Sequence, residues 1–446
     1  RRVKSPAESG EKRVNMKQAV KIAVLGCGTV GAQVVRLLQE RAADYQARCG
    51  SSLEIIGICV HNLAAPRPDF ISRDLLTDQA EPLIDQADLV IELIGGIEPA
   101  RTYITRALEA GKSVVTGNKA LLAQHGPELF DLSREREADL YYEAAVAGAI
   151  PVVYGLRESL AGDRVQVVQG IVNGTTNYML DQMEKKGWSF EQALTTAQEL
   201  GYAEADPTAD IDGLDAAAKC ALLAQLAFHT RVSLDQVAVK GIRSITADDI
   251  ADAKESGRTI KLLAIAQLAQ DEQGRECVSC RVEPVLVKPE NPLASIAGAF
   301  NAIVIDAEAA GRLMFYGQGA GGVQTASAVL SDVVAAAFHL VSGGSAPRES
   351  AYADLPQMPA GQVSSKYSIR LQVEDVTGVL AEVAGIFARR GISIEQVRQR
   401  SDAKSGKAIV SLSSDWASAG DIDLTVKDLE AAEPVSRVIQ VISMEG

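Results

Sequence analysis

The run Val20-Lys-Ile-Ala-Val-Leu25, followed at once by Gly26-Cys-Gly-Thr-Val-Gly31, is the stretch that decides the fold. A short, mostly apolar run of this kind is typical of a buried strand, and the apolar spacing after the glycines predicts a helix. Gly-x-Gly-x-x-Gly is a weak motif alone, but a preceding strand and a following helix are the context that it needs. Its glycines permit a tight turn and let backbone N–H groups approach a pyrophosphate at the helix N-terminus. We therefore predict a dinucleotide site here, in preference to a purely structural glycine turn.

The 130 residues around this motif alternate between strand-like and helix-like patterns. Further strands are predicted at 53–60, 88–94, 113–116 and 140–143, and helices at 99–110 and 121–137. This alternation indicates an α/β domain, a Rossmann-type doubly wound parallel sheet over residues 18–150. An Ala-rich helix at 320–341 is expected to pack back onto the same domain.

Two further domains follow. The pattern over 151–319 is mixed and predicts an α+β substrate and dimerisation domain, with helices at 152–160, 215–230 and 258–268 and strands at 164–172, 277–287 and 302–307. Residues 342–365 are rich in Ser, Gly and Pro, which favours a linker. Beyond it, residues 366–446 read as βαββαβ, the order of a ferredoxin-like module.

Composition limits the classes of function. The chain has 446 residues and a net charge of -14, which argues against nucleic-acid and anionic-membrane partners. No apolar run reaches the roughly 18 residues that a membrane span needs. Residues 1–17 contain no apolar segment and are expected to be a disordered extension, with Met16 as the natural start.

The cysteines indicate a reducing compartment. Six cysteines are scattered through the chain, which is typical of reduced thiols in a cytoplasmic protein. Cys277 and Cys280 form one C-x-x-C, which leaves open a metal or redox role. No second pair completes a zinc site, so ordinary strand residues are the favoured interpretation.

The end of the second predicted strand bears on the choice of cofactor. An acidic residue there usually binds the ribose 2′-hydroxyl of NAD. Val60, His61 and Asn62 provide none, while Arg67 follows shortly after. The absence of a carboxylate and the nearby cation favour NADP over NAD, although Arg67 as a solvated side chain is the alternative.

The acidic segment at 201–219 gathers carboxylates and a lysine in an otherwise apolar neighbourhood. Asp215 and Lys219 are i,i+4 on a predicted helix and therefore share one of its faces. The rest of this helix is small and apolar, so the pair is expected to be partly buried. Buried charge is costly unless it is paired or used, which favours a functional role over a simple surface pair.

This segment, AQELGYAEADPTADIDGLDAAAK at 197–219, resembles the signature of homoserine dehydrogenases. The resemblance continues in the same order from about Val20 to Leu340. Matching segments are Val115-Thr-Gly-Asn-Lys119, Glu143-Ala-Ala-Val-Ala-Gly-Ala-Ile-Pro151, Gly170-Ile-Val-Asn-Gly-Thr-Thr-Asn177 and Gly317-Gln-Gly-Ala-Gly-Gly322. It implies an NAD(P)-dependent interconversion of L-aspartate 4-semialdehyde and L-homoserine, in the biosynthesis of threonine, methionine and isoleucine.

The resemblance also implies roles for individual residues. Lys219 is expected to be the acid/base that protonates the aldehyde oxygen, and Asp215 to hold that lysine and the substrate hydroxyl. Substrate-binding residues are then Glu204, Asp210, Tyr202, Thr175 and Lys219. A cation beside the carbonyl oxygen donates a proton and stabilises the alkoxide that forms as hydride arrives.

Cofactor and cation sites are implied in the same way. Cofactor-binding residues are expected to be Gly26, Gly28, Thr29, Val30, Gly31, Gly95, Lys119 and Gly319. A monovalent cation, Na⁺, is expected at Glu143, Val146, Gly148 and Ile150, mainly through backbone carbonyls. The family often has a basic and then an acidic residue where His61 and Asn62 stand, and a lysine in place of Ala65, so we expect NADP-leaning or dual cofactor use.

The C-terminal module resembles an ACT domain, on Glu374-Asp-Val-Thr-Gly-Val-Leu380 and Gly391-Ile-Ser-Ile-Glu395. Such domains bind amino acids where two of them pair, so feedback inhibition by threonine and a homodimer or homotetramer are expected. Thr377 replaces the proline usual before Gly378. Two alternatives are another Rossmann oxidoreductase, such as an aspartate-semialdehyde dehydrogenase with a cysteine nucleophile, and a catalytically silent amino-acid sensor.

Overall fold

The computed structural model describes residues 19–402 and 407–445, which form two compact units. The first unit contains the described residues up to Asn118, Glu128–Tyr142 and Val329–Arg348; the second contains Lys119–Pro127, Glu143–Ala328 and the chain from Glu349. The predicted extension at 1–17, including Met16, lies outside the described residues.

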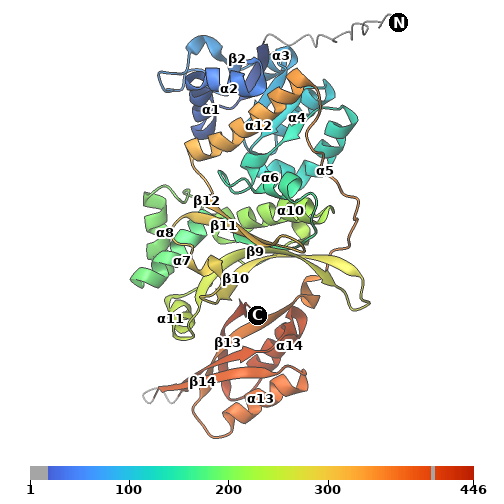
Figure 1. The fold of residues 1–446 in the computed structure, drawn as a ribbon. Helices are drawn as coiled ribbons and strands as arrows, with labels where there is room; N and C mark the ends of the chain where they lie inside the picture. The colour runs from blue at the N-terminus through green and yellow to red at the C-terminus, as the bar shows by residue number, and fades with distance from the viewer. Residues whose placement is uncertain (1–18, 403–406, 446) are drawn as a thin grey trace, which may run out of the picture. The chain divides into compact units, whose positions relative to one another are not determined.

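The first unit is built on a sheet with the order β3-β2-β1-β4-β5-β6 (Figure 1). Its strands are β1 (Ala19–Leu25), β2 (Ser52–Cys59), β3 (Leu76–Thr77), β4 (Leu89–Glu92), β5 (Ser113–Thr116) and β6 (Leu140–Tyr141). Every pairing in this sheet is parallel, which confirms the predicted doubly wound class. Strand β3 was not predicted, because two residues are too few for a periodic pattern.

The helices that connect these strands follow the predicted alternation. They are α1 (Thr29–Glu40), α2 (Ala42–Cys49), α3 (Ala80–Gln86), α4 (Ala100–Glu109) and α5 (Lys119–Glu135). The apolar face of α1 buries Val34, Val35, Leu37 and Leu38. Burial on this scale contributes about 1.5–3 kcal/mol for each large aliphatic side chain, so packing holds the helix more than its intrinsic propensity does.

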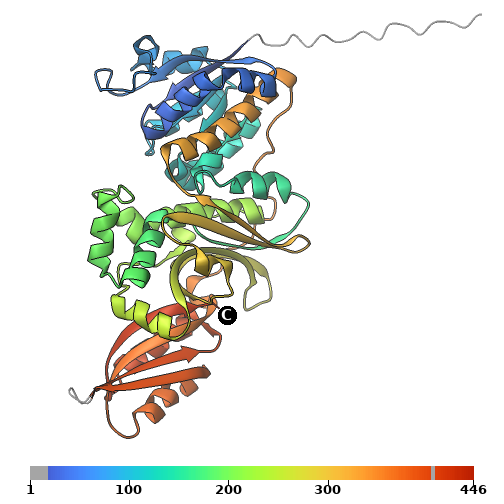
Figure 2. The same ribbon diagram turned by 60° about the vertical axis from the view of Figure 1, so that its left-hand side comes forward.

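The second unit contains a curved antiparallel sheet with the order β12-β11-β7-β9-β10 (Figure 2). Its strands are β7 (Val165–Ile171), β9 (Thr259–Gln270), β10 (Glu276–Val287), β11 (Phe300–Ala307) and β12 (Gly311–Gln318). Helices α7 (Gly174–Lys186) and α10 (Leu214–Phe228) contact this sheet. Strand β12 was not predicted and forms one edge of the sheet.

The helix predicted at 258–268 is wrong, because these residues form β9. Positions Ile260–Ala266 are buried without interruption, and a strand buried on both faces reads as a continuous apolar run. Periodicity cannot distinguish such a run from a buried helix. Long-range pairing decides the outcome, since β9 pairs with β10 from Thr259↔Val287 to Gln270↔Glu276.

The C-terminal module has the predicted βαββαβ order. It consists of β13 (Ser364–Glu374), α13 (Val379–Arg389), β14 (Ile394–Asp402), β15 (Lys407–Ser414), α14 (Ala419–Glu430) and β17 (Val435–Met444). These strands lie in the order β17-β13-β15-β14 over a core that includes Ile369, Val383 and Phe387.

The module's sheet is continuous with that of the substrate domain, which the sequence did not predict. Strand β17 pairs in parallel with β10 through Val285↔Ser443 and Leu286↔Met444. The sheet that ends in β10 and the sheet of the C-terminal module therefore share a backbone hydrogen-bonded seam within the second unit.

Helix α12 (Gly322–Ser342) confirms the predicted Ala-rich helix. Among the described residues it is the one helix long and apolar enough to cross a membrane, although the sequence analysis expected no such run. Half of its most apolar window is buried inside the protein, and it carries the fully buried Asp332. The core helix of a soluble domain has the same properties.

Candidate active site

Helix α10 places two charged side chains in an apolar setting. Every residue from Asp215 to Phe228 is buried, so α10 is enclosed on all sides. Asp215 and Lys219 are each 8% exposed and form the predicted i,i+4 ion pair, with 2.7 Å between Nζ and Oδ2. This confirms that the pair is not a solvated surface pair.

The Lys219 ammonium has a second partner that the sequence analysis missed. Its Nζ donates to the backbone carbonyl of Val172 at 2.6 Å, as well as to Asp215. An ammonium group has three donors. Two of them hold Lys219, and the third has no partner among the residues that the structure describes. Burial lowers the pKa of Lys219 below its ordinary value, while the Asp215 carboxylate acts in the opposite direction.

Asp215 is the centre of the cluster. Its Oδ2 accepts from Lys219 and from the Asn173 amide at 2.9 Å, and its Oδ1 lies 2.5 Å from Lys119 Nζ. Burial alone raises the pKa of this carboxyl, but Lys219 and Lys119 together outweigh burial and hold the pKa below its usual range. Asp215 is therefore a fixed anion between two cations.

The two lysines differ in their acid–base character. The side chain of Lys119, at the start of α5, is 43% exposed, whereas that of Lys219 is 9% exposed. Burial lowers the pKa of Lys119, but the Asp215 carboxylate outweighs it, and the pKa is raised. A general acid or base works best when its pKa is near the operating pH, so Lys219 is the better suited of the two.

Asn173 links the parts of this cluster. It caps the N-terminus of α7, where its Oδ1 accepts from the Thr176 N–H, while its Nδ2 donates to Asp210 at 2.7 Å and to Asp215 at 2.9 Å. Burial raises the pKa of the Asp210 carboxyl. No role was predicted for Asn173 from the sequence, although an Asn directly before a helix start is a typical N-cap signal.

Of the remaining predicted substrate residues, Thr175 lies in the first turn of α7, and Tyr202 and Glu204 lie on the loop that it contacts. Thr175 Oγ1 donates to the Tyr202 carbonyl at 2.6 Å, and the Tyr202 ring lies 5.0 Å from that of Tyr178. Glu204 is exposed and acts electrostatically on Lys119. The loop therefore presents an accessible carboxylate next to the buried cluster.

The glycine turn in the first unit has the geometry of a dinucleotide-binding turn. A Cβ on Gly26 would lie 2.6 Å from the Leu93 carbonyl oxygen, and one on Gly31 would lie 2.2 Å from the Gly26 carbonyl oxygen. Gly28 has nothing within 4 Å of its Cβ position and precedes α1 with no side-chain cap. The outer two glycines are thus required for packing, and the middle one leaves open the approach to the helix N-terminus.

A second loop of the first unit is held by residues that the sequence analysis did not select. Glu92 Oε1 accepts from the N–H groups of Ile94 and Gly95, and its Oε2 accepts from Thr116 Oγ1 at 2.6 Å. Asn118 Nδ2 donates to the Gly96 carbonyl at 2.7 Å. Glu92 is fully buried at the end of β4, so it shapes the loop that contains Gly95.

Arg67 contacts the glycine turn directly. Its Nη1 donates to the Cys27 carbonyl at 2.7 Å, 40 residues away in sequence. The side chain is therefore not the solvated surface group that the sequence analysis left open.

The segment predicted to bind a cation forms a tight turn. Ala147 and Gly148 have φ values of 56° and 57°, and a Cβ on Gly148 would lie 2.4 Å from the Gly319 carbonyl oxygen. The Glu143 carboxylate accepts from the N–H groups of Val153 and Tyr154. Burial raises the pKa of this carboxyl to about 7.

Cys277 and Cys280 lie on β10, where an odd spacing directs side chains to opposite faces of the sheet. In the described ranges there is no group of three or more His, Cys, Asp or Glu residues that could hold a metal. The two cysteines behave as strand residues.

A parallel sheet of this order with an open glycine turn places the chain in the class of dinucleotide-binding α/β proteins. Comparison with known proteins makes the assignment specific. Family models match at 26–143 (homoserine dehydrogenase, NAD binding domain), at 151–334 (homoserine dehydrogenase) and at 367–433 (ACT domain).

Relatives of nearly equal length are similar over almost the whole chain. A homoserine dehydrogenase of Corynebacterium glutamicum is 50% identical over 96% of both chains. A solved homoserine dehydrogenase from Thiobacillus denitrificans is 34% identical, covers 96% of this chain and 98% of its own, and has a TM-score of 0.90. A hyperthermophilic archaeal homoserine dehydrogenase, solved in complex with NADPH, is 26% identical, covers 71% of this chain and 97% of its own, with a TM-score of 0.60.

The chain belongs to the homoserine dehydrogenase family. It is an oxidoreductase of amino-acid biosynthesis that interconverts L-aspartate 4-semialdehyde and L-homoserine with NAD(P). The rival based on a cysteine nucleophile is also unsuited to the site, because a hydrogen bond with Cys280 and burial raise the pKa of the Cys220 thiol.

Proposed function

We propose that Lys219 is the general acid and base of the reaction, and that its one uncommitted N–H carries this role. In the reducing direction, Lys219 gives a proton to the aldehyde oxygen as the aldehyde carbon gains hydride, which leaves the homoserine hydroxyl. In the oxidising direction, neutral Lys219 removes the hydroxyl proton. The nicotinamide, when bound, supplies or accepts the hydride. The support is the orientation of Nζ by Val172 and Asp215, and the lowered pKa of a buried lysine.

Asp215 and Lys119 then set the electrostatic surroundings of the substrate oxygen. Asp215 is held ionised and steadies Lys219, and the more exposed Lys119 is a second cation for substrate or cofactor. Glu204 and Asp210 suit the ammonium group of an amino-acid substrate. Thr175 donates to the Tyr202 carbonyl and so helps to hold the loop that carries Glu204. The test is the loss of turnover in a Lys219→Met variant, designed below.

NADP is the proposed preferred cofactor, held at Gly26, Gly28, Gly31 and the first turn of α1 (Thr29, Val30). No carboxylate follows β2 at Val60, His61 or Asn62, and the guanidinium of Arg67 is anchored at the same turn. A 2′-phosphate suits a guanidinium and would be repelled by a carboxylate. Arg67→Ala is expected to raise the KM for NADP while leaving the KM for NAD nearly unchanged. A preference of about 100-fold for NAD in kcat/KM, about 2.7 kcal/mol, would overturn the proposal.

A monovalent cation is proposed at the turn formed by Glu143, Val146, Gly148 and Ile150. Carbonyl and carboxylate oxygens are hard donors, which suit Na⁺. A buried carboxyl with a pKa raised to about 7 also fits a neighbouring cation that would favour its ionised form. The Ile150 carbonyl already accepts from the Val152 N–H at 2.8 Å, so it is the weakest member of the set. Stabilisation by NaCl that exceeds that by choline chloride, and is lost in Glu143→Gln, is the expected result.

Threonine is the proposed effector of the C-terminal module, at the turn that begins α13. Gly378 has a φ of +95° and nothing within 4 Å of its Cβ position, so an approaching ligand could reach the backbone. Removing the module would also strip β17 from β10, so a point variant is the cleaner test. Gly378→Ala is expected to weaken threonine inhibition at least tenfold, while Gly391→Ala, at another open turn of the module, leaves it unchanged.

A homodimer or homotetramer in the cytoplasm completes the proposal. Edge strand β12 exposes Met314 and Tyr316, and the Tyr316 ring stacks 5.2 Å from that of Phe300. Exposed apolar side chains on an edge strand favour burial against a second copy. Light scattering should give a mass at least twice 47.2 kDa. Six free cysteines support a reducing compartment.

A further inference from the structure

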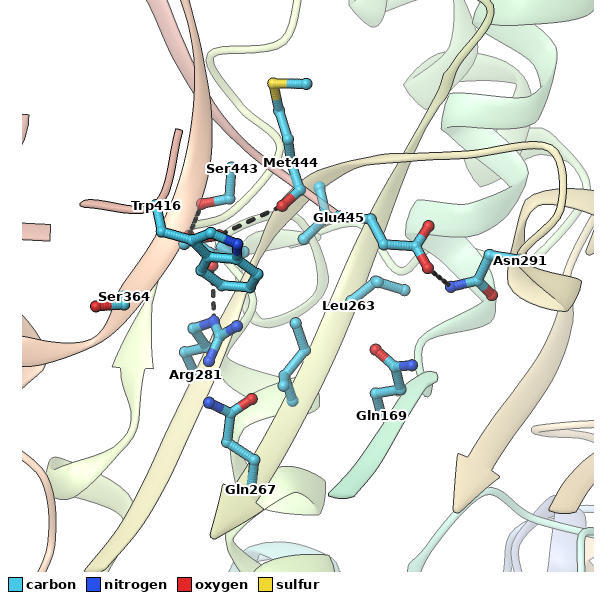
Figure 3. A pocket seen from close by; sticks show the side chains of 14 residues that line it. Gln169, Leu263, Gln267, Arg281, Asn291, Ser364, Trp416, Ser443, Met444 and Glu445 are labelled. Carbon is cyan, nitrogen blue, oxygen red and sulfur yellow. Dashed lines mark hydrogen bonds and ion pairs between the residues drawn. The ribbon is translucent and has the colours of Figure 1, made fainter. Parts of the chain in front are cut away.

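A cavity of about 140 Å³ lies along the seam that joins the substrate domain to the C-terminal module (Figure 3). Strands β7, β9 and β10 contribute one side of it, and β17 and the turn after β15 contribute the other. The lining side chains that can recognise a ligand are Gln169, Gln267, Arg281, Glu283, Trp416 and Glu445. All of them belong to the second unit.

Arg281 provides a binding group for an anion in this cavity. Its Nε donates to Glu283 Oε1 at 2.9 Å, but its buried Nη1 has no hydrogen-bond partner among the residues that the structure describes. A buried charged donor without a partner is costly, and a carboxylate pairs with a guanidinium through two parallel hydrogen bonds. Glu283 is engaged on its other oxygen by Ser443, which keeps Arg281 and β17 in fixed relation.

The opposite charge is also present. Glu445 lines the cavity, with one carboxylate oxygen accepting from Asn291 Nδ2 at 2.7 Å and the other from the Lys288 N–H at 3.1 Å. Both donor groups are uncharged amides, and Arg312, which interacts electrostatically with Glu445, does not line the cavity. The Glu445 carboxylate can therefore attract a cation in the cavity. Gln169 and Gln267 offer both donors and acceptors, and Leu263 adds an apolar surface.

The backbone of the same strands contacts the catalytic helix on the other face of the sheet. Cys220 follows Lys219 on α10, and its Sγ donates to the carbonyls of Ile265 at 3.6 Å and Arg281 at 3.8 Å. The side chains of Ile265 and Arg281 line the cavity. A ligand that moves either strand would therefore act on the residue next to the proposed acid/base.

We propose that this seam cavity binds a small α-amino acid, with its carboxylate on Arg281 and its ammonium group toward Glu445, and that its occupation alters turnover through β9, β10 and α10. The volume suits a ligand with few side-chain atoms, and a zwitterion offers a carboxylate to the open Nη1 of Arg281 and an ammonium group to Glu445. Gly378 does not line this cavity, so binding of an amino acid in the cavity and binding of threonine at the Gly378 turn can be tested separately.

The experiment uses the full-length enzyme with Trp188→Phe, which leaves Trp416 as the single tryptophan of the two in the chain. Trp416 fluorescence is titrated with L-alanine, L-serine and L-threonine, and in parallel with propionate and propylamine. A saturable response to at least one amino acid, at least tenfold tighter than to propionate or propylamine, is expected. No saturable response, or equal affinity for propionate, overturns the zwitterion site.

Variants locate the site and test its effect on turnover. Arg281→Met is expected to weaken binding at least tenfold. Gln267→Leu, at a half-buried position that requires no ion pair for folding, should weaken it about threefold or more and retain basal turnover. Gly378→Ala should titrate like the parent. Unchanged affinity in the Gln267 variant, or saturating ligand that changes neither kcat nor KM, would overturn the proposal.

Discussion

The cluster at the start of α10 and the glycine turn after β1, the two proposed binding regions, differ in the groups that they offer to a ligand. In the first, Asp215, Lys219, Lys119 and Asn173 act through side chains, three of them buried. In the second, Gly26 and Gly31 let the backbone pack closely because they have no side chain, and Gly28 leaves the approach to the N-terminus of α1 open. The buried cluster is therefore sensitive to a lost charge or donor, and the turn to an added methyl group.

Energetics separate the two regions further. Removing one partner of a buried ion pair costs about 3–5 kcal/mol, because the other charge is left uncompensated. At the turn, the cost depends on whether a methyl group meets protein atoms or only the space that a ligand would occupy. Four experiments test this difference between the cluster and the turn, and the largest expected effect comes first.

Lys219→Met removes the proposed acid/base while keeping a side chain of similar length. We expect kcat for homoserine oxidation to fall by about 10²–10⁴-fold, the usual contribution of a positioned acid or base. Lys119→Met is the matched control, because it also removes a cation from Asp215. Its loss of kcat should be smaller; a larger loss than in Lys219→Met would transfer the acid/base role to Lys119.

Asn173→Asp separates positioning from helix capping. The new carboxylate can still accept from the Thr176 N–H. It can no longer donate hydrogen bonds to Asp210 and Asp215, and it adds a negative charge beside them. Hydrogen bonds to charged groups contribute about 1.5–3 kcal/mol, so kcat should fall roughly 10–100-fold.

Ser189→Ala is the control for capping, since Ser189 caps α8 (Phe190–Glu199) without touching the cluster. It should cost about 1 kcal/mol of stability and leave kcat unchanged. If Asn173→Asp merely lowers Tm and keeps kcat, Asn173 has no positioning role.

Gly28→Ala and Gly31→Ala test the glycine turn. The new methyl group in Gly28→Ala meets no protein atom within 4 Å, so the fold should keep its Tm while the KM for NADP rises on the order of tenfold. Gly31→Ala places a Cβ 2.2 Å from the Gly26 carbonyl oxygen and should lose about 1–3 kcal/mol of stability. Equal Tm losses in the two variants would contradict the division of roles.

The pH dependence of turnover tests the state of Lys219. Because its pKa is lowered from the ordinary 10.5, oxidation, which needs neutral Lys219, should rise with pH and level off below that value. Reduction, which needs the ammonium form, should fall over the same range.

The Asp215 carboxylate opposes the lowering of the Lys219 pKa. Asp215→Asn should therefore shift the pH profiles of oxidation and of reduction to lower pH by about one unit. The measurement is kcat/KM as a function of pH for oxidation and for reduction. Profiles that shift to higher pH, or do not shift, would contradict the role of Lys219 as the acid and base.

Much of the architecture was predictable because its signals are local. A short stretch of sequence is enough to predict each of three features. These are the strand, glycine turn and helix of 20–40, the βαββαβ order after residue 365, and the i,i+4 pair Asp215 and Lys219. The β9 segment failed because a fully buried strand has no alternation to read.

What lay beyond prediction depends on residues distant in sequence. Asn173 meets Asp215 across 42 residues, Val172 meets Lys219 across 47, and Arg67 meets Cys27 across 40. Each residue alone reads as a loop polar group or an ordinary strand residue. The packing of α7 and α10 against the sheet brings Asn173 and Val172 to the charges. The fold of the first unit brings Arg67 to the glycine turn.

The amino-acid order alone was sufficient for the class of fold, the glycine turn, the ACT module and the i,i+4 pair of Asp215 and Lys219, because periodicity, turn chemistry and helical spacing act over a few residues. The tertiary structure determined which of two lysines has the lowered pKa, which side chains steady Asp215, and that β17 joins β10. Burial and hydrogen-bond partners set those properties, and both arise from contacts between segments that the chain order does not place together.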